Sequence, residues 1–324
     1  MNALIFPILR LLADGRFHSG EALAKNFGVT RATIWNALQD AEAMGIRVFS
    51  VRGKGYCLPD PVQFLQRKKV LEPLAVTAPD IVLEIHDCID STNSYLMRLA
   101  ADGAAHGHCV TAELQTGGRG RRGRPWLIDF GNGLTFSLLW RFECGVAGLS
   151  GLSLAVGVAL ARALQALGVS GIGLKWPNDV LHRQKKLAGI LIELQGDMDG
   201  PSAAVIGIGL NLRLHQALKN KIGQPATDLL SATRNEIDRN HLLSLLLLHL
   251  TETLQEFVRD GFDKLRGEWE SLHAYHGQSV CLLLPDGSEV RGIASAVAPD
   301  GALLLDTGAG VQRFSSGEVS LRIA

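Results

Sequence analysis

The chain has 324 residues, which is too long for one ordinary core and predicts two or three domains. With 47% apolar and 20% charged residues, the composition is that of an ordinary soluble globular protein, and a formal net charge of zero points to no particular partner. The charge is unevenly spread, because residues 1–70 carry ten Lys or Arg against five Asp or Glu, a net charge of +5. Such a basic first segment is a mild indication of a polyanionic partner.

The cysteines and the apolar segments exclude several classes of protein. The five cysteines are odd in number and scattered, which argues against a metal-ligand motif or a disulfide framework and favours a reducing compartment. The N-terminus lacks the basic-then-apolar pattern of a signal peptide. Residues 146–161 are free of charge, but this run is short for a membrane span and carries Gly and Ser, so we expect a buried helix. The protein is therefore expected to be cytoplasmic, with no membrane partner.

Three helices are predicted at the start of the chain. Residues 3–13 have apolar residues at helical spacing. Ser19 can cap a short second helix that Gly28 ends, and Thr30 can cap a third that runs to Met44.

A hairpin follows these helices. A strand, a turn and a returning strand are predicted at residues 46–51, 52–55 and 56–58. Helix, helix, turn, helix and hairpin is the order of a winged helix-turn-helix, so residues 1–61 are predicted to be a DNA-binding domain. Residues 62–80 are expected to be a linker, helical over 62–72.

The rest of the chain predicts two further domains. Residues 81–273 mix strands and helices around a largely buried sheet. Strands are expected at residues 81–87, 108–114, 134–142, 188–195 and 203–210, and helices at 92–101, 149–168 and 239–260. Residues 274–324 show no helical period, and turns at 285–287 and 299–301 between short strands predict a small β-barrel. The expected fold class is multidomain α+β.

A glycine–arginine loop is the first candidate for chemistry. Residues 118–123 match the dinucleotide pattern G-x-G-x-x-G, but Arg-Pro-Trp follows where that motif requires a helix, so we reject the Rossmann interpretation. A Walker loop also fails, because Gly53-Lys54 is followed by Gly55. Backbone amides beside glycine and paired guanidinium groups suit an anion, which predicts a loop that is mobile when empty and ordered by a phosphate-bearing ligand. A solvated basic loop, or one that touches RNA, is an equally good interpretation of the residue types alone.

Three more segments carry polar residues at the ends of predicted strands. Lys-Trp-Pro-Asn-Asp at 175–179 precedes Lys185-Lys186 and an apolar strand, which can place an ammonium against a ligand anion or form a hairpin with two solvent-exposed lysines. The glycines of the apolar strand 205–211 permit close backbone approach or simply allow packing. Ser-Thr-Asn at 91–93 can cap a helix or present polar groups to a small ligand.

Together and in this order, these motifs resemble the biotin–protein ligase family. The shared set is Ser-Thr-Asn, Q-x-x-G-R-G-R-R-G-R-x-W, K-W-P-N-D, K-L-A-G-I-L and G-I-G-x-N. With the N-terminal winged helix and Gly-Lys-Gly-Tyr in its wing, the chain looks like the bifunctional type, which is both ligase and repressor of the biotin operon. The resemblance covers essentially the whole chain. It implies a central domain of mixed α/β class II synthetase-like fold and a C-terminal barrel of SH3-like type.

The resemblance implies a two-step reaction. Biotin and ATP, with Mg²⁺, form biotinyl-5′-AMP, which stays bound until a lysine of the biotin carboxyl carrier protein of acetyl-CoA carboxylase takes the biotin. By motif, the biotin-binding residues are Ser91, Thr92, Asn93, Gln115, Arg119, Gly120, Arg121 and Lys186. The nucleotide-binding residues are Arg121, Trp126, Lys175, Asn178 and Asn211. Lys186 is expected to neutralise the reacting carboxylate and phosphate, Arg119 to retain the adenylate, and Asp179 to help bind the metal. Pro125 is a departure from the pattern, and it should stiffen the exit of the loop.

The resemblance also implies a DNA-bound state. The third helix should be the recognition helix, with phosphate contacts from the wing. The residues expected at DNA are Arg31, Thr33, Trp35, Asn36, Arg52 and Lys54. The partners implied are operator DNA of the biotin genes and, when the adenylate is bound, a second copy of the chain joined through central-domain strands.

Alternative functions remain at this point. A lipoate- or octanoate-type protein ligase has a related fold, but it lacks the Gly-Arg-Gly-Arg-Arg-Gly loop. A pure transcription factor with a degenerate effector domain does not need Arg119, Arg121 and Lys186. A ligase whose winged helix only packs against the catalytic domain, without repressing, is the third alternative.

Overall fold

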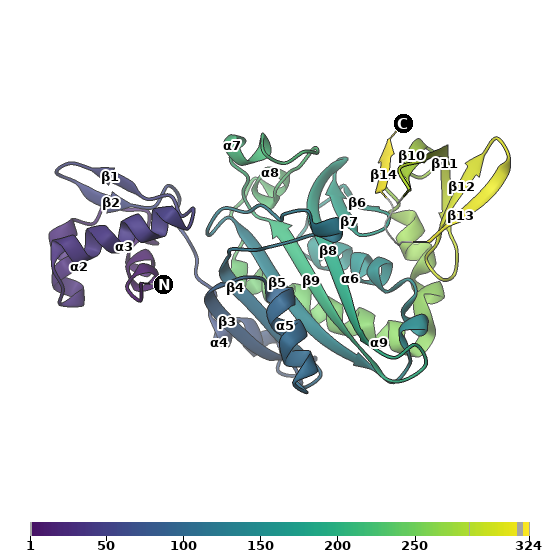
Figure 1. Cartoon of the computed structure of the whole chain (residues 1–324), viewed down its shortest axis with the longest axis horizontal. Helices are drawn as coiled ribbons and strands as arrows, with labels where there is room; N and C mark the ends of the chain where they lie inside the picture. Colours follow the sequence, from purple (N-terminus) through teal and green to yellow (C-terminus); the bar gives the residue numbers. More distant parts are fainter. Residues whose placement is uncertain (1, 285, 316–319, 324) are drawn as a thin grey trace.

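The structure is a computed structural model that describes residues 2–284, 286–315 and 320–323. Figure 1 shows three units in chain order: a helical N-terminal domain with a small hairpin, a central domain built on a large sheet, and a small C-terminal sheet. The N-terminal domain lies at one end of the elongated molecule and the C-terminal sheet at the other.

The N-terminal domain has the predicted helix-turn-helix and hairpin. Its elements are α1 (Ile5–Leu12), α2 (Gly20–Phe27), α3 (Arg31–Ala43), β1 (Phe49–Val51) and β2 (Gly55–Cys57). Ser19 Oγ accepts from Ala22 N at 3.0 Å, and Gly28 ends α2 in the left-handed conformation at φ 65°, as their residue types predict. The strand predicted at 46–51 is shorter, because only residues 49–51 pair with 55–57, while Ile46 and Val48 are buried in the core of the domain.

The linker departs from the predicted helix at 62–72. Only α4 (Arg67–Leu71) is α-helical, and a 3₁₀ turn, η1 (Glu72–Leu74), follows it. The preceding residues bond to the central domain instead: Leu65 N donates to Glu113 Oε1 at 2.7 Å, and Gln66 N donates to Asn240 Oδ1 at 2.6 Å. Both partners lie far away in the sequence, so the helical spacing of apolar residues at 62–72 could not predict these hydrogen bonds.

The central domain is built on a seven-stranded mixed sheet. The strand order is β3 (Val82–Ile89), β4 (His108–Gln115), β5 (Gly133–Phe142), β9 (Ser202–Asn211), β8 (Lys185–Gly196), β7 (Asp179–His182) and β6 (Ile172–Lys175). Only β3 and β4 are parallel. The five predicted strands are present, whereas the short β6–β7 hairpin was not predicted as two strands.

Helices cover both faces of this sheet (Figure 1). On one face, α5 (Thr92–Ala101) packs its Leu96 against Val110, Leu139 and Val205. On the other face lie α6 (Leu152–Ala166), which η3 (Val146–Leu149) precedes, and the long α9 (Arg239–Ser271). By length and composition the stretch 146–166 could cross a membrane, but 61% of its most apolar 18-residue window is buried within the protein. The predicted helix 239–260 continues beyond Gly261, where a φ of 71° interrupts it.

Two short helices and a small sheet complete the chain. The helices α7 (Gln216–Lys219) and α8 (Leu229–Thr233) were not predicted. The C-terminal sheet is antiparallel, in the order β13 (Gly310–Phe314), β12 (Leu303–Thr307), β11 (Glu289–Val297), β10 (Ser279–Leu283) and β14 (Ser320–Ile323). The predicted turn at 299–301 is present, with Gly301 N donating to Ala298 O. The other predicted turn includes Pro285, which lies outside the described residues.

Aromatic rings join the N-terminal and central domains. Phe130, which follows the glycine–arginine loop, packs edge-on against Phe6 of α1 at 6.1 Å and against Phe64 of the linker at 5.8 Å. Two ion pairs flank these rings, Arg10 with Asp87 and Arg47 with Asp129. The described residues contain no disulfide, and all five cysteines are free, in agreement with their scatter in the sequence.

Candidate active site

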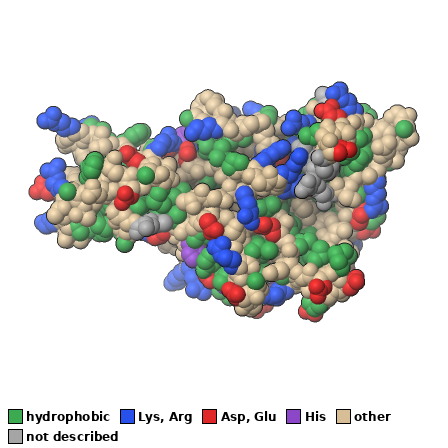
Figure 2. Space-filling model, viewed as in Figure 1, with side chains coloured by type: hydrophobic (Ala, Val, Ile, Leu, Met, Phe, Trp, Pro, Cys, Tyr) green, Lys and Arg blue, Asp and Glu red, His purple; other side chains and the backbone are tan. Residues whose placement is uncertain are grey.

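A cavity of about 710 Å³ opens on the central domain and reaches the C-terminal sheet. Every ligand-site residue expected from the sequence lines this cavity, although these residues come from five separate segments of the chain. They are Ser91, Thr92, Asn93, Gln115, Arg119, Gly120, Arg121, Trp126, Lys175, Asn178, Asp179, Lys186 and Asn211. Lys and Arg side chains gather on this face of the molecule, where the central domain meets the C-terminal sheet (Figure 2).

One end of the cavity is a buried polar network at the start of α5. Gln115 Oε1 accepts from Thr92 N at 2.7 Å and from Thr92 Oγ1 at 3.1 Å. Ser137 Oγ, fully buried on β5, lies 2.7 Å from Thr92 Oγ1. Ser91 caps the helix by accepting from Ser94 N at 3.4 Å. The capping and ligand-presenting interpretations of Ser-Thr-Asn therefore do not exclude each other.

Asn93 is held from three sides in this network. Its Nδ2 donates to Leu191 O at 3.2 Å and to Glu193 Oε2 at 2.8 Å, while its Oδ1 accepts from Ser137 Oγ at 2.6 Å. Both amide hydrogens are therefore used inside the protein. Asn93 can offer a ligand only the second lone pair of its Oδ1, so it can receive an N–H group but cannot donate one.

The glycines of β9 create the floor of the cavity. A Cβ at Gly207 would lie 2.0 Å from Asn93 Oδ1, and a Cβ at Gly209 would lie 2.4 Å from Trp126 Cε2. Each glycine thus makes room for one side chain of the site. The two glycines are therefore explained by close packing against site side chains.

The glycine–arginine loop is a closed hairpin rather than the start of a helix. Trp126 N donates to Gly118 O at 2.9 Å, and Gly120 N donates to Arg124 O at 2.7 Å. Pro125 lies opposite Arg119 between these two bonds, at a position where the ladder needs no N–H from it. The only helical residues here are the 3₁₀ turn η2 (Arg121–Gly123), which confirms the rejection of a Rossmann site.

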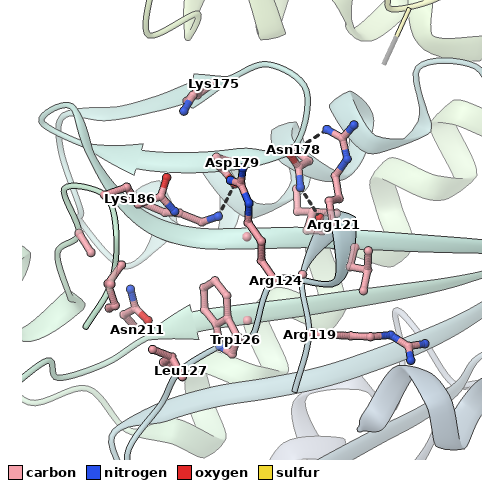
Figure 3. A pocket seen from close by; sticks show the side chains of 18 of the residues that line it. Arg119, Arg121, Arg124, Trp126, Leu127, Lys175, Asn178, Asp179, Lys186 and Asn211 are labelled. Carbon is pink, nitrogen blue, oxygen red and sulfur yellow. Dashed lines mark hydrogen bonds and ion pairs between the residues drawn. The ribbon is translucent and has the colours of Figure 1, made fainter. Parts of the chain in front are cut away.

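Two arginines of this loop are attached to the walls of the cavity. Arg119 Nη2 donates to Glu193 Oε1 at 2.8 Å, and Arg121 Nη1 donates to Asn178 Oδ1 at 3.3 Å. Asn178 is itself held, since its Nδ2 donates to Ile190 O at 2.7 Å. Burial lowers the pKa of Arg121. Figure 3 shows the Arg119 side chain directed away from Lys186 and Asp179.

At the other end of the cavity, Lys186 Nζ lies 2.6 Å from Asp179 Oδ1 (Figure 3). The two side chains are only 17% and 12% exposed, and the ammonium lies over the Trp126 ring at 5.5 Å. Lys186 N donates to Pro225 O, which brings the loop before α8 to the cavity. The interpretation of both lysines as solvent-exposed is wrong for Lys186, because β7 and β8 fold it inward, whereas Lys185 is exposed.

Further polar groups lie at this end. Burial lowers the pKa of Lys175, whose ammonium lies 5.8 Å from the centre of the Tyr275 ring. Asn211 Nδ2 donates to Thr227 O at 3.0 Å. Among the described residues, the buried Nε1 of Trp126 has no hydrogen-bond partner. A partly buried set of cations beside an aromatic ring suits an anionic, ring-bearing ligand such as a nucleotide.

The donor set fits a metal ion only if a ligand supplies most of its oxygen atoms. The described residues contain no group of three or more His, Cys, Asp or Glu side chains placed to hold a metal. Asp179 is a single carboxylate next to the cations. A magnesium ion bound through one carboxylate and phosphate oxygens is compatible with this arrangement.

The residues expected at DNA lie on the far domain. On α3, Arg31, Trp35 and Asn36 are exposed and Thr33 is partly exposed, and Trp35 is 53% exposed despite its size. In the wing, Arg52 and Lys54 are exposed, and Lys54 Nζ lies 5.8 Å from the centre of the Phe17 ring. Lys and Arg side chains project from this end of the molecule (Figure 2).

Sequence reasoning missed several residues that shape the site. They are Ser137, Glu193, Tyr275 and the segment 221–226. Glu193 and Ser137 act through partners 100 and 44 residues away in sequence. No local motif signals such contacts, although a carboxylate within the apolar run of β8 is an unusual feature that could have attracted notice.

Comparisons with known proteins agree with this division of the chain. Residues 85–211 match the model of the biotin/lipoate A/B protein ligase family, residues 6–57 match a model of an HTH domain, and residues 275–322 match the biotin protein ligase C-terminal domain.

Proteins and structures from three organisms are similar to the chain. The bifunctional ligase/repressor BirA of Escherichia coli K12 is 38% identical, over 100% of this chain and 98% of that protein. A biotin–[acetyl-CoA-carboxylase] ligase of Mycobacterium tuberculosis is 36% identical, over 71% and 85%. The solved structure of a biotin protein ligase from Aquifex aeolicus in complex with biotin and ATP superposes with a TM-score of 0.64 and 32% identity, covering 75% of this chain and 99% of that one.

Proposed function

The chain belongs to the biotin protein ligase family. From this premise we propose that the cavity catalyses biotin ligation and that the N-terminal domain binds DNA. The chain is an ATP-dependent biotin–protein ligase that is also a DNA-binding, biotin-responsive repressor. The observation that carries the catalytic part is the convergence of five separate motif segments on one cavity. We take residues 1–61, 62–80, 81–273 and 274–324 as DNA-binding domain, linker, class II synthetase-like catalytic domain and SH3-like C-terminal barrel.

The reaction needs negative charge to be gathered and water to be excluded. In the first step a carboxylate oxygen of biotin bonds to the α-phosphorus of ATP, and pyrophosphate leaves. In the second step the amine of a lysine on the biotin carboxyl carrier protein attacks the carbonyl of biotinyl-5′-AMP, and AMP leaves. The cavity has a neutral polar end and a cationic end, which suits a ligand that is uncharged at its ring and anionic at its tail.

The neutral end is proposed for the ureido ring of biotin. Thr92 and Gln115 offer hydroxyl and amide groups, and Ser91 stands at the start of α5 beside them. Asn93 receives a ureido N–H through its remaining lone pair, and its other Oδ1 contact is with Ser137 Oγ, which also lies beside Thr92 Oγ1. Gly120 lets the loop approach the valeryl chain closely.

The cationic end is proposed for the carboxylate and the nucleotide. Lys186 is proposed to neutralise the reacting oxygen atoms, and Arg121, Lys175 and Asn178, which line the same cavity, are proposed to contact the phosphates. Trp126 packs beside the adenine, and Asn211 lines the same region. Asp179 would hold Mg²⁺ together with the phosphates. When bound, the metal supplies positive charge that stabilises the departing pyrophosphate.

A labelling assay tests the catalytic proposal. The protein is incubated with biotin, ATP and a biotin carboxyl carrier domain, and the product is detected by streptavidin blot. We expect a labelled carrier, and no label when ATP is omitted. Lipoate and octanoate in place of biotin test the related ligases: modification by these acids but not by biotin would overturn the proposal.

For the N-terminal domain, we propose that α3 enters the major groove and the wing contacts phosphates. Arg31, Thr33, Trp35 and Asn36 face the bases, while Arg52 and Lys54 add positive charge. We further propose that the adenylate-bound chain forms a homodimer through strands of the central domain, where β3 is an edge strand. A gel-shift assay on the promoter of biotin-synthesis genes, with and without biotin and ATP, tests repression. No shift in either condition would leave only the ligase.

A further inference from the structure

A tyrosine from the C-terminal part of the chain borders the cationic end of the cavity. Tyr275 follows α9, is 6% exposed and lines the cavity together with Lys175 of β6. The Lys175 ammonium lies 5.8 Å from the centre of the Tyr275 ring. Figure 3 shows Lys175 at the same end of the cavity as Asp179, away from Arg119. The ring is therefore placed to act on a cation at the end of the cavity proposed for the nucleotide.

Lys175 has no carboxylate partner among the described residues. Asp179 pairs with it across the β6–β7 hairpin, but the Asp179 carboxylate is 2.6 Å from Lys186 Nζ. Burial lowers the pKa of Lys175 most, and the Asp179 charge only partly offsets this effect. The like charges of Lys186, Arg322 and Arg124 lower this pKa further. Any contact that favours the charged form therefore matters at this ammonium.

An aromatic ring can hold such a cation without cancelling its charge. The negative face of a ring attracts an ammonium that lies within about 6 Å of its centre. A carboxylate would attract the ammonium too, but it would also repel the phosphates of an incoming ligand. Burial raises the pKa of the Tyr275 hydroxyl, so the ring stays neutral at physiological pH. Tyr275 thus gives Lys175 a partner that leaves its positive charge available.

The segment that carries Tyr275 is bonded to the residue before Lys175. Leu174 N donates to Leu272 O at 2.7 Å, and Ala274 N donates to Leu174 O at 2.9 Å. These two bonds place residues 272–274 beside β6 as an added short strand. The backbone of Tyr275 is therefore held next to the backbone of Lys175.

The tryptophan after Lys175 provides a second attachment. Trp176 is fully buried, and its Nε1 donates to Gly301 O, in a turn of the C-terminal sheet, at 3.0 Å. The Lys-Trp-Pro-Asn-Asp motif is thus attached to the C-terminal part of the chain on both sides of its lysine. Backbone contacts therefore set the distance between the Tyr275 ring and the ammonium.

We propose that Tyr275 is a positioning residue that holds the Lys175 ammonium, charged and in place, toward the phosphates of the bound nucleotide. The contact is a cation–π interaction, in which the ring acts through its face and not through its hydroxyl group. This inference rests on the proposed function for the identity of the nucleotide. The contact between ring and ammonium is present in the ligand-free protein.

Fluorinated phenylalanine at position 275 tests the contact without any ligand. Fluorine atoms weaken the negative face of the ring and change its shape little, so Tyr275→Phe is the matched control for 3,4,5-trifluorophenylalanine at this position. Acetic anhydride, which reacts only with neutral amines, labels Lys175 at a series of pH values, and mass spectrometry measures the label. A weaker attraction favours the neutral amine. Below the midpoint of the titration, we therefore expect about fivefold faster labelling with the fluorinated ring than with Phe.

Two comparisons control this labelling experiment. Tyr275→Phe should label like the wild type, because the face of the ring remains. Lys264, exposed on α9, should label equally in all three proteins. The other charged groups around Lys175 are the same in all three and cancel in the comparison. They are Asp179, Lys186, Arg124 and Arg322. Equal labelling of Lys175 with Phe and with trifluorophenylalanine would overturn the proposal.

The kinetics of biotinyl-5′-AMP formation test whether the contact serves the nucleotide. We expect KM for ATP to be about fivefold higher with trifluorophenylalanine than with Phe at position 275, while kcat and KM for biotin stay the same. In the Lys175→Met background the two rings should give the same KM for ATP, because the cation is gone. An equal rise in that background would show that the ring acts without Lys175, and the proposal would be wrong.

The two tests separate the contact from the proposed function. If the wild type forms no biotinyl-5′-AMP, the proposed function fails, while the labelling still decides whether the ring holds Lys175. If labelling differs between the two rings but KM for ATP does not, the contact exists without serving the nucleotide, and the proposal is wrong. If the trifluorophenylalanine protein does not fold, as judged by urea unfolding, 4-fluorophenylalanine replaces it, with a smaller increase in labelling expected. No increase would again count against the contact.

Discussion

The indole of Trp126 occupies the space that a side chain at position 209 would need. A Cβ on Gly209 would lie 2.4 Å from Trp126 Cε2, and a Cβ on Gly189 of the neighbouring strand would lie 3.1 Å from Trp126 Cζ3. Two paired glycines of β8 and β9 thus form a flat bed for the ring. The ring in turn supports the Lys186 ammonium, so the cationic end of the cavity depends on the absence of two side chains.

Gly209→Ala should therefore move the indole and weaken nucleotide binding. Overpacking of this kind costs about 1–3 kcal/mol, which corresponds to a rise of roughly 5- to 160-fold in KM for ATP if the whole cost falls on nucleotide binding. Steady-state kinetics of pyrophosphate release measure this rise, and KM for biotin should change less. Gly267→Ala is the matched control, since a Cβ there meets nothing within 4 Å. An unchanged KM for ATP in Gly209→Ala would contradict the packing argument.

Local chemistry explains why much of this architecture could be predicted. The caps at Ser19 and Thr30 and the glycine at 28 set the helix ends of the N-terminal domain by interactions within a few residues. The site residues followed from a resemblance in which five motifs occur in order, and all of them line one cavity. Rejection of the Rossmann interpretation needed only the proline and tryptophan after the loop.

What could not be predicted depends on partners far away in sequence. Residues 62–66 have helical spacing, but Glu113 and Asn240 hold their backbone in a non-helical path. Glu193 has no local signature, because its meaning comes from Arg119 and Asn93 on other elements. In each case tertiary hydrogen bonds override the local preference for secondary structure. Such bonds join residues far apart in the sequence, so a local sequence pattern cannot predict them.

A buried ion pair anchors the linker, and breaking it should destabilise the protein. Arg239 Nη1 lies 2.8 Å from Glu113 Oε2, with side chains 4% and 1% exposed, and Arg239 also donates to Gln63 O and Gly133 O. Glu113→Leu would leave the guanidinium buried without its counter-charge, at a cost of about 3–5 kcal/mol. Urea unfolding measures this loss. Arg266→Gln, at a far more exposed ion pair on α9, should change stability much less.

His273 should make the protein less stable in acid. It is 7% exposed, neither ring nitrogen has a hydrogen-bond partner among the described residues, and burial lowers its pKa to about 4, with the nearby His276 contributing. The unfolded chain therefore binds this proton at higher pH than the folded chain does. The stability is fully present above about pH 6.5 and is lost as the pH falls towards 4, by about 3 kcal/mol in total.

His273→Phe isolates this effect, because a phenyl ring can still pack on Trp269, whose ring centroid lies 4.8 Å away. We expect urea unfolding of the variant to lose less stability than the wild type between pH 6.5 and 4. His106 and His182, whose pKa values burial also lowers, remain in both proteins and cancel in the comparison. Parallel stability curves for the two proteins over this range would show that His273 is not the group responsible.

The wing should contribute charge to DNA binding rather than base recognition. Arg52 and Lys54 are exposed at the turn between β1 and β2. Replacing either with Ala should weaken operator and non-specific DNA alike and reduce the slope of log K against log salt by about one. Gel-shift titrations at several salt concentrations measure both quantities. Lys264→Ala, on α9 of the central domain, should leave the slope at its wild-type value, and loss of specificity without a change in slope would place the wing at the bases instead.

For the Lys186–Asp179 pair, we predict that a double variant reacts faster than the single variant Lys186→Met. Lys186→Met removes the ammonium that faces the reacting oxygen atoms, and it leaves the Asp179 carboxylate unpaired beside an incoming phosphate. The loss of one such charge costs about 10²- to 10³-fold in rate, and the exposed carboxylate adds repulsion to that. The double variant Lys186→Met with Asp179→Asn removes the repulsion, so single-turnover pyrophosphate release should recover roughly tenfold relative to Lys186→Met.

If Asp179 instead acts mainly by holding Mg²⁺, the double variant will be slower than Lys186→Met, and raising the magnesium concentration will narrow the difference. The order of these two rates therefore decides whether Asp179 serves the lysine or the metal.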